Sequence, residues 1–266
     1  MEAKSISSVH NPLVKQILLL KEKSRERKKS GLFVVEGQRE LELAQKGGYT
    51  LSTFLYCPEI WSEQHLKQVL GNSKPEIIQI TRPVYEKLAH RGTTEGVLGI
   101  LKAKEHVLEN IQFKNEQPLV LVAEAPEKPG NIGALLRTAD AAAVDAVLIA
   151  NPKSDLYNPN IIRSSVGCVF TNQVGMGSTE EIIQFLQNNQ IKIYCAALTA
   201  SVNYVDCDFT GASALVMGTE ATGLTQDWLQ NSNQNIIIPM QGEIDSMNVS
   251  VSAAILIFEA KRQRGF

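Results

Sequence analysis

The feature that most constrains the fold is a regular alternation of apolar runs and helical patterns through residues 119–263. The apolar runs predict strands at 119–123, 146–150, 169–174, 191–197, 212–217 and 235–239. Between them lie predicted helices at 133–143, 179–188, 225–230 and 249–263, with a short helical turn at 161–167. Apolar strands that alternate with helices are typical of a parallel sheet covered on both faces. We therefore predict an α/β fold whose ligands bind at the carboxyl ends of the strands.

A weaker alternation of the same kind precedes this region. It predicts helices at 11–26, 38–45, 62–70 and 83–89 and strands at 32–35, 51–56, 76–80 and 96–101. Residues 102–117 are polar and charged, with few apolar anchors. The sequence thus predicts a smaller N-terminal α/β domain over residues 1–105, a linker over 106–117 and a larger domain over 118–266.

The net charge of −2 averages two halves of opposite sign. Residues 1–116 contain 18 Lys and Arg against 14 Asp and Glu, whereas residues 117–266 contain 8 against 14. Seven of the positive charges lie between Lys15 and Lys29, with only Glu22 and Glu26 among them. Charge asymmetry between halves indicates nucleic-acid contact on the basic side, and a solvated helix face is the alternative.

The four cysteines limit the chemistry further. Cys57, Cys168, Cys195 and Cys207 show no C-x-x-C spacing, so we expect neither a zinc site nor a disulfide framework. Cys57 and Cys195 lie in apolar runs and are expected in the core. Free thiols suit a reducing cytoplasm, and we expect a cytoplasmic protein without signal peptide, membrane span or metal.

Three loops that follow predicted strands carry polar residues that packing explains poorly. They are P-G-N-I-G-A-L-L-R-T-A-D at 129–140, V-M-G-T-E-A-T-G-L at 216–224 and I-P-M-Q-G-E-I-D-S-M-N-V-S at 238–250. Each has an ordinary explanation by itself. Asn131 would cap a helix, Glu220 would favour a helix N-terminus, and Ser246 or Asn248 would be an N-cap. No loop is a G-x-G-x-x-G or a P-loop, so a nucleotide-phosphate cradle has no support.

Taken together and in this order, the loops resemble the three motifs of the SpoU (TrmH-like) RNA 2′-O-ribose methyltransferases of the SPOUT class. The matching patterns are N-x-G-x-x-x-R-T-A from Asn131, G-x-E-x-x-G-L from Gly218 and I-P-M-x-G-x-x-x-S-M-N-V-S from Ile238. Near the N-terminus, I-S-S-x-x-N-P-x-V-K followed by F-V-V-E-G resembles the substrate-binding domain of members that act on large-subunit rRNA.

The resemblance implies S-adenosylmethionine as cofactor, a deep trefoil knot in the C-terminal part and a homodimer formed through the C-terminal domain. It implies a catalytic set of Arg137, Asn131, Glu220, Asn248 and Ser250. The implied cofactor contacts are Leu198, Gly218, Ile238, Met240, Met247 and Asn248. Two residues depart from the family pattern. Ala221 stands where Gly is frequent, and Met247 replaces the usual Leu, a swap that conserves volume.

The family's catalytic arginine raises a chemical question. Methyl transfer requires removal of the hydroxyl proton, yet arginine is normally never deprotonated in proteins. Arg137 is therefore expected either to act as a base assisted by an RNA phosphate or to clamp the phosphate and orient the hydroxyl. Glu220 is the easier base on pKa grounds.

The predicted function is methyl transfer from S-adenosylmethionine to a ribose 2′-hydroxyl of RNA, with 23S rRNA favoured over tRNA. Phosphate contacts are expected from Lys15, Arg25, Arg27, Lys28, Lys29 and Arg137. The alternatives are a tRNA enzyme of the same fold and a catalytically silent RNA-binding protein. A dinucleotide-dependent enzyme is disfavoured by the missing phosphate loop.

Overall fold

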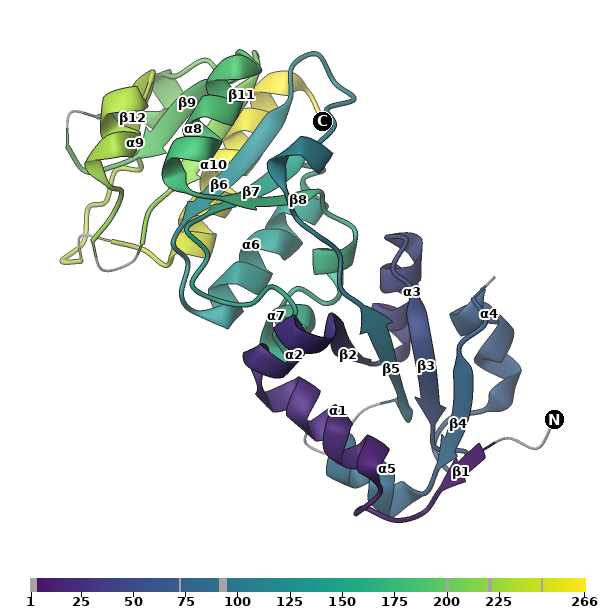
Figure 1. Ribbon diagram of the computed structural model, residues 1–266. Helices are drawn as coiled ribbons and strands as arrows, with labels where there is room; N and C mark the ends of the chain where they lie inside the picture. The colour runs from purple at the N-terminus through teal and green to yellow at the C-terminus, as the bar shows by residue number, and fades with distance from the viewer. Residues whose placement is uncertain (1–3, 72, 91–94, 200, 220–221, 245) are drawn as a thin grey trace. The chain divides into compact units, whose positions relative to one another are not determined.

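The computed structural model describes residues 4–71, 73–90, 95–199, 201–219, 222–244 and 246–266. They form two compact units (Figure 1). The first contains residues up to 104 together with 155–171, and the second contains 105–154 and 172–266. The predicted boundaries place 155–171 in the larger domain, whereas its contacts group it with the first unit.

A mixed sheet in the order β1-β4-β3-β5-β2 forms the centre of the first unit. β1 and β3 run parallel to β4, and β5 runs antiparallel to β2 and β3. The strands are β1 Lys4–Ile6, β2 Leu32–Glu36, β3 Leu51–Tyr56, β4 Glu76–Ile80 and β5 Val97–Lys102. The helices are α1 Pro12–Glu22, α2 Ser24–Ser30, α3 Gln38–Lys46, α4 Leu66–Leu70, α5 Arg82–Leu88 and α7 Pro159–Ser164, with 3-10 turns at Glu63–His65 and Cys168–Phe170.

The single helix predicted at 11–26 is wrong. It is divided at Lys23, whose backbone is extended, into α1 and α2. The apolar residues Val14, Ile17 and Leu20 of α1 are buried, whereas Arg27 is the buried residue of α2. Because the apolar stripe ends at Leu20, the residues beyond it have no shared core to hold them in the same helix.

Residues 155–171 join the first unit through an aromatic cluster. The rings of Tyr157 and Phe33 stack with centroids 4.1 Å apart. Tyr49 packs edge-on against both rings, and Phe170 stacks on Phe33 and packs edge-on against Tyr49. The predicted strand at 169–174 is therefore wrong. A 3-10 turn follows Gly167, whose φ is +81°, and it places Phe170 in the cluster. β8 begins only at Val174.

The sheet of the second unit confirms the predicted parallel arrangement. Its order is β10-β12-β9-β11-β6-β7-β8, and every neighbouring pair is parallel. The edge strand β10 was not predicted, because two residues give no periodicity. The strands are β6 Leu119–Glu124, β7 Ala146–Ala150, β8 Val174–Gly177, β9 Lys192–Ala196, β10 Val202–Asn203, β11 Ser213–Met217 and β12 Gln234–Ile237.

Helices cover both faces of this sheet. Val120 and Val122 of β6 pack in one core with Ile182 of α8 and Trp228 of α9. α10 packs against α6, β6 and β11 on the other face. The helices are α6 Pro129–Ala141, α8 Thr179–Asn188, α9 Gln226–Asn231 and α10 Val249–Arg264, with 3-10 turns at Leu108–Asn110 and Tyr204–Asp206. None of the described helices has the length and apolar character needed to cross a membrane.

Candidate active site

Loops at the carboxyl ends of β9, β11 and β12 enclose a cavity of about 560 Å³ in the second unit. This size lies within the range of small-molecule sites in proteins. Much of its wall is apolar, including Leu224 and Ile236. The structure brings together at this wall Leu198, Gly218, Ile238, Met240 and Met247, all implied cofactor contacts. The sixth, Asn248, is not among the lining residues, although both its sequence neighbours are.

Gly218 is required by a close approach of two backbone segments. Thr219 and Gly223 exchange backbone hydrogen bonds of 3.0 and 3.1 Å, which folds the loop after β11 back on itself. A Cβ at Gly218 would lie 2.4 Å from the carbonyl carbon of Gly223 and 2.6 Å from the nitrogen of Leu224. Any side chain at this position would therefore push the cavity wall apart.

We expect Gly218→Ala to weaken binding of S-adenosylhomocysteine by about tenfold or more, because sub-ångström displacement of a wall disrupts its contacts. Titration calorimetry measures this directly. Gly130→Ala is the matched control, since a Cβ there would meet nothing within 4 Å. Equal affinities of the two variants would show that the wall beside Gly218 does not contact the ligand.

A second cavity of about 280 Å³ adjoins the first. Residues at the end of β6 and the start of α6 line it, including Glu124, Lys128 and Asn131. The two cavities share wall residues: Gly218, Thr219, Thr222 and Val249. A ligand in one cavity would therefore lie close to a ligand in the other.

Asn131, Asn248 and Ser250 form one hydrogen-bonded set. The Asn248 amide donates to Asn131 Oδ1 at 3.1 Å, and its own Oδ1 accepts from the Ser250 hydroxyl at 2.6 Å. Asn248 is also the N-cap of α10, as its sequence position suggests. Asn131 is not a cap, because Pro129 starts α6 two residues earlier and leaves Lys128 at the N-cap position. Its side-chain oxygen instead accepts from Asn248 and links the first and third motif loops.

Arg137 lies on α6 with its side chain exposed. Within the described part of the chain it makes no hydrogen bond or ion pair, so its guanidinium is available to a ligand. Glu220, together with Ala221, lies outside the described residues.

Glu124 is a polar residue of this region that sequence reasoning missed. It ends β6 and is only 2% exposed. Its carboxylate accepts hydrogen bonds from Thr179 and Thr225, which follow β8 and β11 in the chain. The available signal was a lone carboxylate at the end of an otherwise apolar strand.

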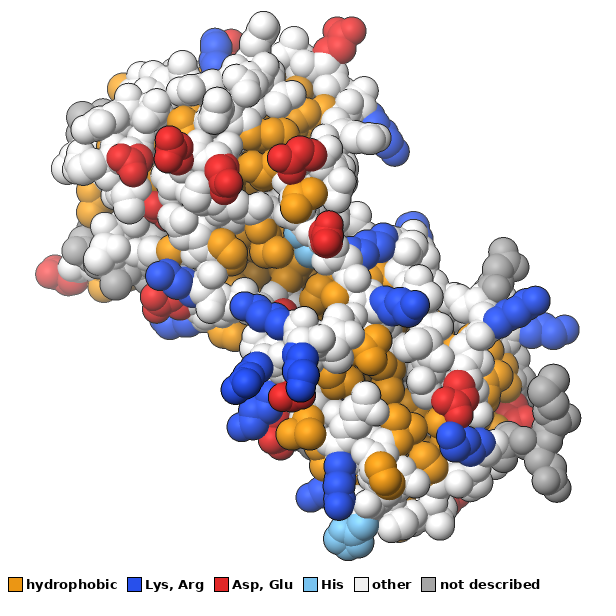
Figure 2. Space-filling model, in the orientation of Figure 1, with side chains coloured by type: hydrophobic (Ala, Val, Ile, Leu, Met, Phe, Trp, Pro, Cys, Tyr) orange, Lys and Arg blue, Asp and Glu red, His pale blue; other side chains and the backbone are white. Residues whose placement is uncertain are grey.

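Basic side chains gather over α1 and α2 of the first unit (Figure 2). Lys15, Arg25, Lys28 and Lys29 are exposed there. Long cationic side chains free in solvent can reach the phosphates of a nucleic acid. Four of the predicted RNA contacts therefore lie where an RNA strand has access to them.

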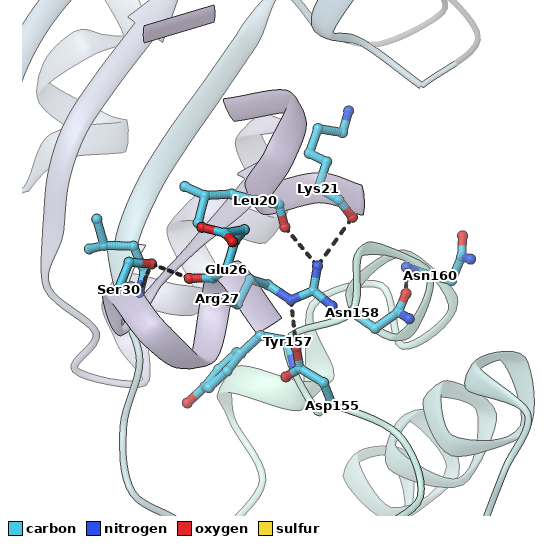
Figure 3. A network of polar contacts seen from close by, with 10 residues as sticks. Leu20, Lys21, Glu26, Arg27, Ser30, Asp155, Tyr157, Asn158 and Asn160 are labelled. Atoms are coloured by element: carbon cyan, nitrogen blue, oxygen red, sulfur yellow. Dashed lines mark hydrogen bonds and ion pairs between the residues drawn. The ribbon is translucent and has the colours of Figure 1, made fainter. Parts of the chain in front are cut away.

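Arg27 is a correction to that prediction. Its side chain is 4% exposed, and its Nε donates to Asp155 at 2.5 Å (Figure 3). Its Nη1 donates to the carbonyls of Leu20 and Lys21, at the end of α1. The guanidinium is thus buried and paired inside the first unit, so it does not contact RNA. It holds α1, α2 and the segment around Asp155 together.

The four cysteines have free thiols in the described structure. All four are buried, which confirms the expected core positions of Cys57 and Cys195. Burial raises the pKa of the Cys195 thiol to about 11, so it stays protonated at neutral pH. Among the described residues, no group of His, Cys, Asp and Glu side chains is arranged to hold a metal ion.

Both parts of the chain match known families. Residues 118–258 match the SpoU rRNA methylase family, and residues 11–99 match the MRM3-like substrate binding domain. The chain is 27% identical to the 23S rRNA (guanosine(2553)-2′-O)-methyltransferase RlmP of Bacillus subtilis, over 97% of this chain and 99% of the relative. It is 33% identical to the 23S rRNA (guanosine-2′-O-)-methyltransferase RlmB of Vibrio vulnificus, over 70% of this chain and 77% of that one.

A solved structure agrees with these sequence matches. The SpoU methyltransferase AviRb from Streptomyces viridochromogenes, in complex with AdoMet, superposes with a TM-score of 0.87 at 26% identity. The match covers 96% of this chain and 98% of that chain. The family match spans more than half of the sequence and includes all three motif loops. The chain therefore belongs to the SpoU rRNA methylase family.

Proposed function

We propose that this protein transfers a methyl group from S-adenosylmethionine to a ribose 2′-hydroxyl of 23S rRNA. The observation that carries the proposal is the pair of adjoining cavities that share Gly218, Thr219, Thr222 and Val249. Two adjoining sites with shared wall residues can hold two ligands close together, as a group transfer between them requires. The named relatives that act on 23S rRNA support the choice of acceptor.

The larger cavity fits the cofactor. Its apolar side chains suit an adenine ring, and Leu198, Gly218, Ile238, Met240 and Met247 would hold the molecule. When bound, S-adenosylmethionine supplies an electrophilic methyl group on a sulfonium. The chain's own task is to hold the acceptor oxygen in line with that methyl, because alignment contributes strongly to the rate.

The smaller cavity would receive the acceptor ribose. Asn131 lines it and is fixed by the amide of Asn248, so its polar atoms are oriented before RNA arrives. Arg137, exposed and unpaired in the described part of α6, would bind an adjacent phosphate through its planar fork. We propose the clamp as the role of Arg137, because a guanidinium is normally never deprotonated, and Glu220 as the proton acceptor.

The exposed cations of α1 and α2 would bind the rRNA phosphates. Each phosphate neutralised by Lys or Arg releases counterions, so affinity falls with salt in proportion to their number. We expect replacement of Lys28 and Lys29 by Gln to weaken RNA binding a few-fold and to lower the slope of log Kd against log salt by about 1 to 2. Filter binding across a salt series measures both quantities. An unchanged slope would remove α2 from the RNA-binding surface.

Family membership also supports two finer proposals. We propose that the C-terminal part of the chain is knotted, and that two copies pair through their C-terminal domains. Exposed apolar side chains on α10, including Val251 and Phe258, support the pairing. Sedimentation of Phe258→Glu against the unmodified chain tests it, and an unchanged dimer would place the interface elsewhere.

Binding of S-adenosylhomocysteine tests the proposed function at its first step. We expect stoichiometric binding in the micromolar range by calorimetry and no binding of NAD. Binding without subsequent methyl transfer to RNA would favour a catalytically silent RNA-binding protein. Binding of NAD instead would overturn the proposal.

A further inference from the structure

Glu124 is a buried carboxylate placed beside the wall that the two cavities share. It lines the smaller cavity and is 2% exposed. No cation pairs with it in the part of the chain that the structure describes. A buried charge is costly unless hydrogen bonds compensate it, so the donors around Glu124 indicate what its carboxylate does.

Thr225 supplies two of these donors. Its backbone N–H donates to Oε2 at 2.9 Å, and its hydroxyl donates to Oε1 at 2.8 Å. The third comes from the hydroxyl of Thr179, 3.2 Å from Oε1. Glu124 therefore joins the end of β6 to the N-cap residue of α9 and to the first residue of α8.

The hydroxyl of Thr225 does not cap the helix that follows it. Thr225 occupies the N-cap position of α9, where a threonine side chain normally accepts a hydrogen bond from the helix backbone. Here it makes no such bond and donates to Glu124 instead. α9 therefore lacks a stabilising side-chain cap, and the hydrogen bonds to Glu124 at the end of β6 hold Thr225 in place.

Thr225 directly follows the wall of both cavities. Thr222 lines both, and Gly223 and Leu224 line the larger one. We propose that Glu124 is a positioning residue for methyl transfer: through Thr225 it fixes residues 222–224, which line the cavities for cofactor and acceptor. This inference rests on the proposed function. A displacement of about 1 Å in a group-transfer site can lower the rate by up to a hundredfold, so the position of these residues matters for transfer.

Two threonine variants separate positioning from simple stabilisation. Thr225→Val and Thr179→Val each remove one hydroxyl from the same carboxylate, but only Thr225 continues into the cavity wall. We expect Thr225→Val to lower kcat for methyl transfer by about tenfold. Thr179→Val should stay within about twofold of the unmodified chain, although it also removes the acceptor of the Asn151 amide. Thr225→Ser keeps the hydroxyl and should retain activity.

Hydrogen exchange gives a readout that does not depend on the RNA substrate. Thr225→Val should speed exchange in the described residues 222–225, and Thr179→Val should not. Glu124→Met should act like Thr225→Val, because it removes the two oxygens that accept hydrogen bonds from Thr225. Equal kcat and equal exchange in the two valine variants would overturn the inference. An unmodified chain that transfers no methyl would contradict the proposed function, and exchange would still decide the role of Glu124.

Discussion

Replacement of Arg137 by Lys is expected to lower kcat for RNA methyl transfer by about a hundredfold or more. Lysine keeps the charge but loses the planar fork that binds a phosphate through two parallel hydrogen bonds. An acceptor held by a single flexible ammonium would lose its alignment with the methyl group, and misalignment of this kind costs about a hundredfold. Single-turnover transfer of labelled methyl to RNA measures the effect.

The remaining properties of this variant should be unchanged. Arg137 is exposed and makes no hydrogen bond or ion pair with a described residue, so neither the melting temperature nor the affinity for S-adenosylhomocysteine should change. Arg39→Lys is the matched control, an exposed arginine on α3 of the other unit. Near-full activity of Arg137→Lys would contradict both roles considered for this arginine.

Replacement of Arg27 by Met is expected to destabilise the first unit by about 3–5 kcal/mol, the usual cost of breaking a buried ion pair from one side. Asp155, whose side chain is 9% exposed, would keep an uncompensated charge. The carbonyls of Leu20 and Lys21 would also lose their donor at the end of α1. Urea denaturation followed by circular dichroism measures the loss.

Two further variants identify the cause. Lys28→Met makes a comparable change at an exposed neighbour and should leave stability within about 0.5 kcal/mol. Arg27→Met combined with Asp155→Asn removes both charges and should recover part of the loss. If the Arg27→Met chain were as stable as the unmodified one but bound RNA more weakly, Arg27 would be an RNA contact and this account of its role would be wrong.

Local pattern predicts most of the second unit. β7 and α8 have the predicted bounds. The signals that define them, an unbroken apolar run and a capped amphipathic helix, lie within a few residues of each other in the sequence. The sequence could not show that residues 155–171 join the first unit. That grouping depends on the stacking of Tyr157 on Phe33 and on a pair between Arg27 and Asp155, 128 positions apart. A basic run also hides which of its cations is buried.

The candidate site was found through the order of three motifs, and each motif loop follows a strand. This is why the cavity is lined by five of the six implied cofactor contacts. Glu124 could not be identified in the same way, because its partners Thr179 and Thr225 stand at the starts of α8 and α9, which no motif connects to β6. The link between Asn131 and Asn248, 117 positions apart, is likewise a product of the fold.

Transfer of a labelled methyl group from S-adenosylmethionine to purified rRNA and tRNA tests the central claim most directly. Methylated 2′-hydroxyls protect the adjoining phosphodiester from alkali, so the label can be located in resistant dinucleotides. We predict label in an alkali-resistant dinucleotide of 23S rRNA, strongly reduced with Gly218→Ala and Arg137→Lys. Label in a base, or label confined to tRNA, would contradict the account.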